Sequence, residues 1–178
     1  MFTKIAVATD GSSLAEKAVR IAAELAAKCG SDLTILHVLM HGEPPAALRR
    51  MAEVEHMVSN QPRVQEVLGR LSGDIPGQLA IATVDVERHR FDHQIIEAIG
   101  EKIVERAKSD AMESAISAVD GKILEGDAAD EILRAIENLD IDLLVLGTRG
   151  LSPLKGLVMG SVSQAVSQKA HCNCLIVK

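Results

Sequence analysis

The chain has 178 residues, enough for one domain that buries about 70% of the surface its unfolded form exposes. A formal net charge of −6, with 2 Phe and neither Trp nor Tyr, argues against a general nucleic-acid binder, a base-stacking module or a membrane-surface protein. The odd number of cysteines, 3, and the lack of any apolar run of the ~20 residues that a membrane helix needs predict reduced thiols and a cytoplasmic location.

The start of the chain reads as strand, helix and strand. Residues 4–8 are short and apolar, as in a buried strand, and residues 15–29 have a helical composition that Gly30 is well placed to end. The spacing of Ser13-Leu-Ala-Glu16 is that of a capping box at the helix start. Residues 32–38 form the second predicted strand, so this segment predicts a right-handed parallel crossover.

The middle of the chain has the least regular pattern. Gly and Pro interrupt residues 39–91 repeatedly, and only 46–58 and 64–71 fit short helices there. Residues 91–109 form a firmer predicted helix, with an apolar stripe of Ile95, Ile96, Ile99, Ile103 and Ala107. We therefore expect a single domain over residues 1–178 with a variable inserted region around 39–91.

The C-terminal third alternates strands and helices. Residues 114–124, 142–146 and 174–177 form the third, fourth and fifth predicted strands. Asp127 is expected to cap the helix after the third strand, and the last helix covers residues 162–170. The inward side of the first of these two helices carries Ile132, Leu133 and Ile136. This alternation predicts an α/β protein with helices layered on a parallel sheet.

The most informative segment lies between the fourth strand and the last helix. Gly147-Thr-Arg-Gly150 is followed, after nine residues, by Gly160-Ser161-Val162-Ser163. Glycines let backbone approach a ligand, and a Gly-Ser pair that opens a helix leaves N–H groups and the positive end of the helix dipole facing outward. Ser161-Val-Ser-Gln164 also has the spacing of a capping box. Phosphate is the expected ligand of this segment.

The spacing Gly-x2-Gly-x9-Gly-Ser resembles the nucleotide-binding signature of the ATP-binding branch of the universal stress protein family. The resemblance extends to residues 4–12, to Leu36-His-Val38 and to residues 170–177. It implies an open five-stranded parallel sheet in the order 3-2-1-4-5 with helices on both faces, of the Rossmann-like adenine nucleotide alpha hydrolase type. In that order the connections reverse direction between strands 1 and 4, the point at which open α/β sheets bind ligands.

The resemblance also implies which residues contact the nucleotide. The sugar and base would lie beside Ala8, Thr9, Asp10 and Val38. The ribose and phosphates would be held by Gly147, Gly150, Gly160, Ser161, Val162 and Ser163. Arg149 would add positive charge, and Mg²⁺ or Mn²⁺ would accompany ATP on the phosphates.

Several of these positions also have a purely structural interpretation. Asp10 suits a turn or a helix cap, and Val38 would face a core in any buried strand. Gly147 and Gly150 suit the end of a strand, and Ser161 suits a helix N-cap whether or not phosphate binds.

Two further spacings suggest metals. His89 and His93 are four residues apart near the predicted start of the helix over 91–109, but no third ligand is evident. Cys172-Asn-Cys174 places two thiols on one face of the last strand, although zinc pairs are usually spaced more widely. We interpret the histidines as solvated and the cysteines as buried, unreactive thiols.

The sequence favours binding over catalysis, because no set of nucleophile, base and orienting residue is visible. The first hypothesis is a cytoplasmic, ATP-binding module of stress response or signalling that binds neither nucleic acid nor membrane. The alternatives are a slow ATPase or a phosphotransferase that modifies its own Ser161 or Ser163, and a partner-binding module without nucleotide. The fifth strand would be an exposed apolar edge, and the resemblance implies a homodimer that pairs two such strands.

Overall fold

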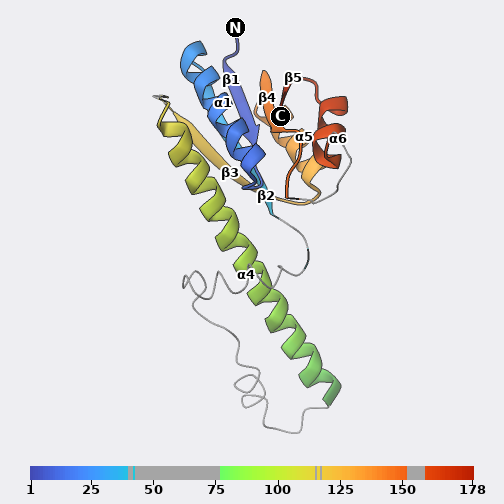
Figure 1. Ribbon diagram of the computed structural model, residues 1–178. Coiled ribbons are helices and arrows are strands. Elements are labelled where there is room, and N and C mark those ends of the chain that lie inside the picture. Colours follow the sequence, from blue (N-terminus) through green and yellow to red (C-terminus); the bar gives the residue numbers. More distant parts are fainter. Residues whose placement is uncertain (40–41, 43–76, 115, 117, 152–158) are drawn as a thin grey trace. The chain divides into compact units, whose positions relative to one another are not determined.

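Five parallel strands form one sheet in the order β3-β2-β1-β4-β5, which confirms the predicted topology (Figure 1). The strands are β1 (Lys4–Ala8), β2 (Asp32–Leu39), β3 (Val119–Glu125), β4 (Leu143–Gly147) and β5 (Asn173–Val177). All four residues from Leu143 to Leu146 are buried, and apolar runs of this kind are typical of parallel strands that are covered on both faces.

The computed structural model describes residues 1–39, 42, 77–114, 116, 118–151 and 159–178. Contacts divide it into a first unit of residues 1–39 and 100–178 and a second unit of residues 40–99. The short helices predicted over 46–58 and 64–71 lie outside the described residues. The single-domain organisation stays a prediction.

Helices cover both faces of the sheet, and β1 alternates between two apolar cores. The helices are α1 (Ser13–Cys29), α4 (Gly77–Met112), α5 (Ala128–Asn138) and α6 (Ser161–Lys169). Ile5 and Val7 lie in the first core, which packs against α1 and against Ala107 and Ala111 of α4. Ala6 lies in the second core, which packs against α5 and α6. No described helix is both long and apolar enough to span a bilayer.

The caps of the helices bear out some predictions and correct others. Gly30 ends α1 with φ +67, and the Asp127 carboxylate accepts hydrogen bonds from the first amides of α5, as predicted. The N-cap of α1, however, is Ser12, whose hydroxyl accepts from the N–H of Ala15 at 3.3 Å. The capping box that begins at Ser13 is therefore wrong by one residue, because the backbone at Ser12 is still extended.

Helix α4 begins at Gly77, well before the predicted start at residue 91. The apolar stripe is largely confirmed, since Ile95, Ile96, Ile99 and Ala107 are buried and Ile103 is half-buried. Residues 78–90 contain neither proline nor glycine, so the sequence allows the helix to extend back to Gly77. His89 and His93 consequently lie inside the helix and not near its start.

The third strand starts later than predicted, at Val119 instead of residue 114. Ser114 belongs to the turn that follows α4, where its N–H donates to the carbonyl of Ala111 at 3.0 Å. The other strand ends either match the prediction, as both ends of β1 do, or differ from it by one residue.

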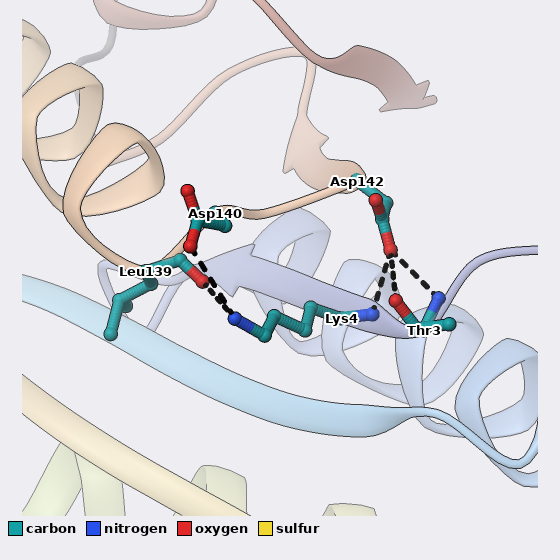
Figure 2. A network of polar contacts seen from close by, with 5 residues as sticks. All are labelled: Thr3, Lys4, Leu139, Asp140 and Asp142. Atoms are coloured by element: carbon teal, nitrogen blue, oxygen red, sulfur yellow. Dashed lines mark hydrogen bonds and ion pairs between the residues drawn. The ribbon is translucent and has the colours of Figure 1, made fainter.

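The amino ends of β1 and β4 are joined by Asp142 (Figure 2). Its Oδ2 accepts hydrogen bonds from the Thr3 N–H at 2.8 Å, the Thr3 hydroxyl at 2.7 Å and the Lys4 N–H at 2.9 Å. These bonds, led by the one from the Thr3 hydroxyl, lower the pKa of Asp142 to about 2. The Lys4 ammonium donates to the Leu139 carbonyl beside it. We call the Thr3–Lys4–Asp142 set the amino-end contact.

Candidate functional site at the carboxyl ends of β1 and β4

The switch point of the sheet lies between β1 and β4, at their carboxyl ends. The connection from β1 runs through α1 to β2 on one side, and the connection from β4 runs through α6 to β5 on the other (Figure 1). Open α/β sheets bind their ligands at such a point. The two predicted segments, residues 8–10 and 147–163, both begin here.

The turn after β1 is fixed by β2. The N–H of Thr9 donates to the Leu36 carbonyl at 2.9 Å, and the Thr9 carbonyl accepts from His37 Nδ1 at 2.8 Å. The Thr9 hydroxyl accepts from the Gly11 N–H at 3.2 Å. Both Thr9 and His37 are buried. The N–H, the carbonyl and the hydroxyl of Thr9 are all hydrogen-bonded within the protein, so Thr9 supports the turn.

Asp10 connects the turn to the loop after β4. One carboxylate oxygen, Oδ1, accepts from the Ser12 N–H at 3.0 Å, and the other, Oδ2, accepts from the Leu151 N–H at 2.8 Å. The structure therefore brings Asp10 and the Gly150–Leu151 peptide together, as the sheet order requires. It also bears out the turn-closing interpretation of Asp10.

The three signature glycines have different surroundings. A Cβ atom at Gly147 would lie 3.1 Å from the Arg149 carbonyl oxygen and 3.3 Å from the Leu14 backbone, so close packing against α1 favours glycine there. A Cβ at Gly150 would lie 2.0 Å from Asp10 Oδ2. At Gly160 the nearest described atom, the Thr148 carbonyl oxygen, would be 3.5 Å away, an ordinary contact distance. Among the described residues, nothing crowds the Cβ position of Gly160.

The start of α6 differs from the predicted capping box. Gly160 is the N-cap, with φ −73 and ψ 156, and no side chain caps the helix. Ser161 is the first helical residue and is exposed, so the prediction that Ser161 caps α6 is wrong by one residue. The Gly160 N–H donates to the Thr148 carbonyl at 2.7 Å. The next amides belong to the first turn, whose N–H groups have no acceptor within the helix.

Ser163 fastens α6 to the end of β4. Its buried hydroxyl donates to the Gly147 carbonyl at 2.7 Å. Gly147 and Ser163, both predicted to contact the nucleotide, are thus adjacent. The Ser163 hydroxyl, however, is bonded to Gly147 itself. A phosphate would meet the N–H of Ser163 more readily than its hydroxyl.

The predicted apolar residues share one side of the sheet. Ala8, Val38 and Val162 are half-buried and all pack against the second core. Arg149, by contrast, is exposed on the loop. The site therefore has an apolar side near the ends of β1 and β2, and backbone N–H groups at the start of α6.

The described part of the chain contains no group of three or more His, Cys, Asp or Glu residues that could hold a metal. His93 Nδ1 lies 3.5 Å from Glu97 Oε1, one turn along α4. Cys172 and Cys174 are half-buried against the second core, and desolvation raises the pKa of both thiols. His89 and His93 are exposed, as interpreted from the sequence, whereas Cys172 and Cys174 are half-buried and not buried.

Sequence reasoning missed two residues that organise this region. Thr148 is buried, and its N–H donates to the Val177 carbonyl at 2.7 Å while its own carbonyl accepts from Gly160. Leu151 provides the amide that Asp10 binds. Both act through their backbone, so their side-chain chemistry gave no signal.

Comparison with known proteins gives a consistent assignment. The model of the universal stress protein family matches residues 1–178. Universal stress protein YxiE of Bacillus subtilis is 33% identical over 180 residues, which cover 100% of this chain and 100% of that protein. Among solved structures, a universal stress protein in complex with cAMP has a TM-score of 0.59 at 19% identity, covering 99% of this chain and 97% of its own. The Archaeoglobus fulgidus protein in complex with dAMP has a TM-score of 0.59 at 21% identity, covering 99% and 98%.

Proposed function

Because the chain belongs to the universal stress protein family, we propose that it binds an adenine nucleotide, ATP, at the switch point between β1 and β4. In this proposal the phosphates contact the first-turn amides of α6, from Ser161 to Ser163, together with the exposed Ser161 hydroxyl. The adenine lies on the apolar side formed by Ala8 and Val38, and the sugar lies near Thr9 and Asp10.

The observation that carries the proposal is the surroundings of Gly160. Its φ of −73 is open to any residue, and a Cβ would have ordinary contacts with the described residues. Neither backbone conformation nor the described packing accounts for glycine at this position. Close approach of a ligand to the backbone at the helix start would account for it.

The complexes of the relatives support the ligand class. Two proteins of this fold have been solved with cAMP and with dAMP, both adenine nucleotides. We propose Mg²⁺ or Mn²⁺ as the companion of the phosphates, because Mg²⁺ is often bound mainly through substrate phosphates and water. Arg149, exposed on the loop, would add positive charge near them.

The proposed role is a nucleotide-dependent module of stress response or signalling in the cytoplasm. The three cysteines are free thiols, which suits a reducing compartment. Strand β5 is an edge of the sheet, and its Leu175 and Ile176 are only half-buried. We propose that two β5 edges pair in a homodimer. Sedimentation of a monomer at micromolar concentration would contradict this part of the proposal.

Calorimetry with ATP and Mg²⁺ on the full chain tests the site. Gly160→Val should fold, because extended backbone accepts β-branched residues, but should block the helix start. Ser161→Glu should repel the phosphates. We expect each to weaken ATP binding by about tenfold or more, comparable to one charge-assisted hydrogen bond.

Gln168→Glu is the matched control, because it adds the same charge at an exposed position near the other end of α6. Unchanged ATP affinity in folded Gly160→Val and Ser161→Glu would remove the site assignment. Because the chain has no Trp or Tyr, absorbance near 260 nm also reveals any copurified nucleotide directly. Failure of the wild type to bind ATP, ADP or AMP would favour a partner-binding module without nucleotide.

A further inference from the structure

The carboxylate of Asp10 has a partner on each oxygen. Ser12 N–H, within the same turn, donates to Oδ1, and Leu151 N–H, 141 residues further along the chain, donates to Oδ2. The second bond crosses from the end of β1 to the loop after β4. It fixes the position of the loop one residue beyond Gly150.

The carboxylate also explains the glycine beside it. The φ of Gly150 lies outside the left-handed region, so backbone conformation does not demand glycine. Space does, because a Cβ at Gly150 would lie 2.0 Å from Asp10 Oδ2 and 3.1 Å from Asp10 Cγ. No side chain fits at position 150 while Asp10 keeps its bond to Leu151.

We propose that Asp10 is a positioning residue that holds the Gly150–Leu151 segment after β4 by accepting the Leu151 N–H, and that position 150 is glycine in order to admit this carboxylate. The sequence predicted that Asp10 and Gly150 each contact the nucleotide. In this assignment they instead take part in one contact within the protein, between the Asp10 carboxylate and the Gly150–Leu151 segment. Asp10 then acts on the nucleotide through the loop, and Gly150 need not touch the nucleotide at all.

The turn that carries Asp10 is itself hydrogen-bonded to β2. The preceding residue, Thr9, is bonded through its N–H to Leu36 and through its carbonyl to His37. The other end of the loop is fixed as well, because the Gly160 N–H donates to the Thr148 carbonyl. The N–H groups of Leu151 and Gly160 are therefore both bonded, the first to the Asp10 carboxylate and the second to the Thr148 carbonyl.

Only the consequence for ATP rests on the proposed function; the contact itself can be tested without nucleotide. The experiment compares wild type with Asp10→Ala, Gly150→Ala and the double variant, all as full chains. Hydrogen exchange of the Leu151 amide is measured in nucleotide-free protein, and thermal unfolding reports folding. Each single substitution should speed Leu151 exchange by roughly tenfold, the effect of losing one hydrogen bond to a charged acceptor.

The double variant decides the assignment. Once Asp10→Ala has removed the carboxylate, Gly150→Ala should change Leu151 exchange by less than about twofold, because the two substitutions break the same contact. If Gly150→Ala alone does not fold, the proposal predicts that Asp10→Ala restores folding to it. Effects that multiply, a double variant that stays unfolded, or a Leu151 exchange rate unchanged in Asp10→Ala would each overturn the proposal.

Calorimetry of the same variants separates this proposal from the proposed function. If wild type binds no ATP but the coupling between positions 10 and 150 is found, the positioning role stands and the nucleotide site fails. If ATP binds and Gly160→Val weakens it without any coupling between positions 10 and 150, the nucleotide site stands and the positioning role fails.

Discussion

Two aspartates join the same pair of neighbouring strands, one at each end. At the amino end, Asp142 precedes β4 and binds Thr3 and Lys4 of the β1 segment (Figure 2). At the carboxyl end, Asp10 follows β1 and binds Leu151 after β4. Both use a carboxylate to accept backbone N–H groups across the β1–β4 pair, but they differ in how many donors they gather.

Three donors converge on one oxygen of Asp142, whereas Asp10 receives one donor on each oxygen. Around Asp10 the partner segment is a glycine loop whose Arg149, Gly150 and Leu151 are exposed. An amino-end contact of this kind stabilises the sheet. At the carboxyl end, the single bond from the Leu151 N–H to Asp10 positions the segment beside the proposed nucleotide site. Similar carboxylate chemistry therefore stabilises the sheet at one end and positions a segment of the site at the other.

The largest effect is expected from the layer beneath the carboxyl-end turn. His37→Ala removes a buried ring whose Nδ1 lies 2.8 Å from the Thr9 carbonyl. The variant leaves that carbonyl without its donor and leaves a cavity, which should cost about 2–4 kcal/mol of unfolding free energy. Denaturant unfolding measures the loss. ATP binding should weaken as well, because Asp10 follows the turn that His37 supports.

His171→Ala is the control for His37→Ala, since His171 is exposed and its removal should change stability by less than about 0.5 kcal/mol. If His37→Ala were as stable as this control, the carboxyl end would contribute little to stability. The difference between the two ends in their contribution to stability would then be larger than we propose.

The second prediction breaks the amino-end contact. Asp142→Ala deprives three hydrogen-bond donors of their acceptor. The loss of these bonds should lower the melting temperature by several degrees in a chain of this length. ATP affinity should stay within about twofold, because the contact lies at the opposite end of the strands. A folded Asp142→Ala variant that loses nucleotide binding would contradict the division of roles.

The same carboxylate predicts a dependence on pH. The folded-state pKa of Asp142 is about 2, below its ordinary value of 3.8. Its contribution to stability is therefore present above pH 3.8 and is lost as the pH falls toward 2. Asp142→Asn should make the loss of stability between these values less steep. Asp140→Asn is the control for removal of a carboxylate beside Lys4, since the Asp140 side chain is 88% exposed, and it should cost less stability at neutral pH than Asp142→Asn.

The fold could be predicted from the sequence because its signals are local or belong to the family. Short apolar runs gave the five strands, and Gly30 and Asp127 gave two helix ends. The helix caps at Ser12 and Gly160 were misplaced by one residue. Neighbouring serines and glycines offer nearly equal capping chemistry, and the tertiary fold decides which of them stays extended.

The site was harder to predict, because its contacts join residues far apart in the sequence. Asp142 reads as the start of a strand, yet its partner Thr3 is 139 residues away. Ser163 reads as a phosphate ligand, but its hydroxyl is bonded to Gly147. The sequence alone cannot distinguish Gly150, where a Cβ atom would clash with Asp10, from Gly160, where a Cβ atom would meet the described residues at ordinary contact distances. The sequence predicted a site at the carboxyl ends of β1 and β4, which stays a prediction, and the structure adds the contacts that Asp10, Gly150 and Ser163 make within the protein.

The smallest expected effect concerns the bond that fastens α6 to β4. Ser163→Ala removes the donor of the buried 2.7 Å hydrogen bond to the Gly147 carbonyl, which should cost about 1 kcal/mol of unfolding free energy. Ser167→Ala is the control on the same helix, because its 3.0 Å bond to Gln164 is exposed and local, and it should be near neutral. ATP affinity should fall by at most a few-fold in Ser163→Ala, since the amide of residue 163 remains in place. A loss of ATP binding as large as that of Gly160→Val, with stability unchanged, would instead make the hydroxyl a direct phosphate ligand.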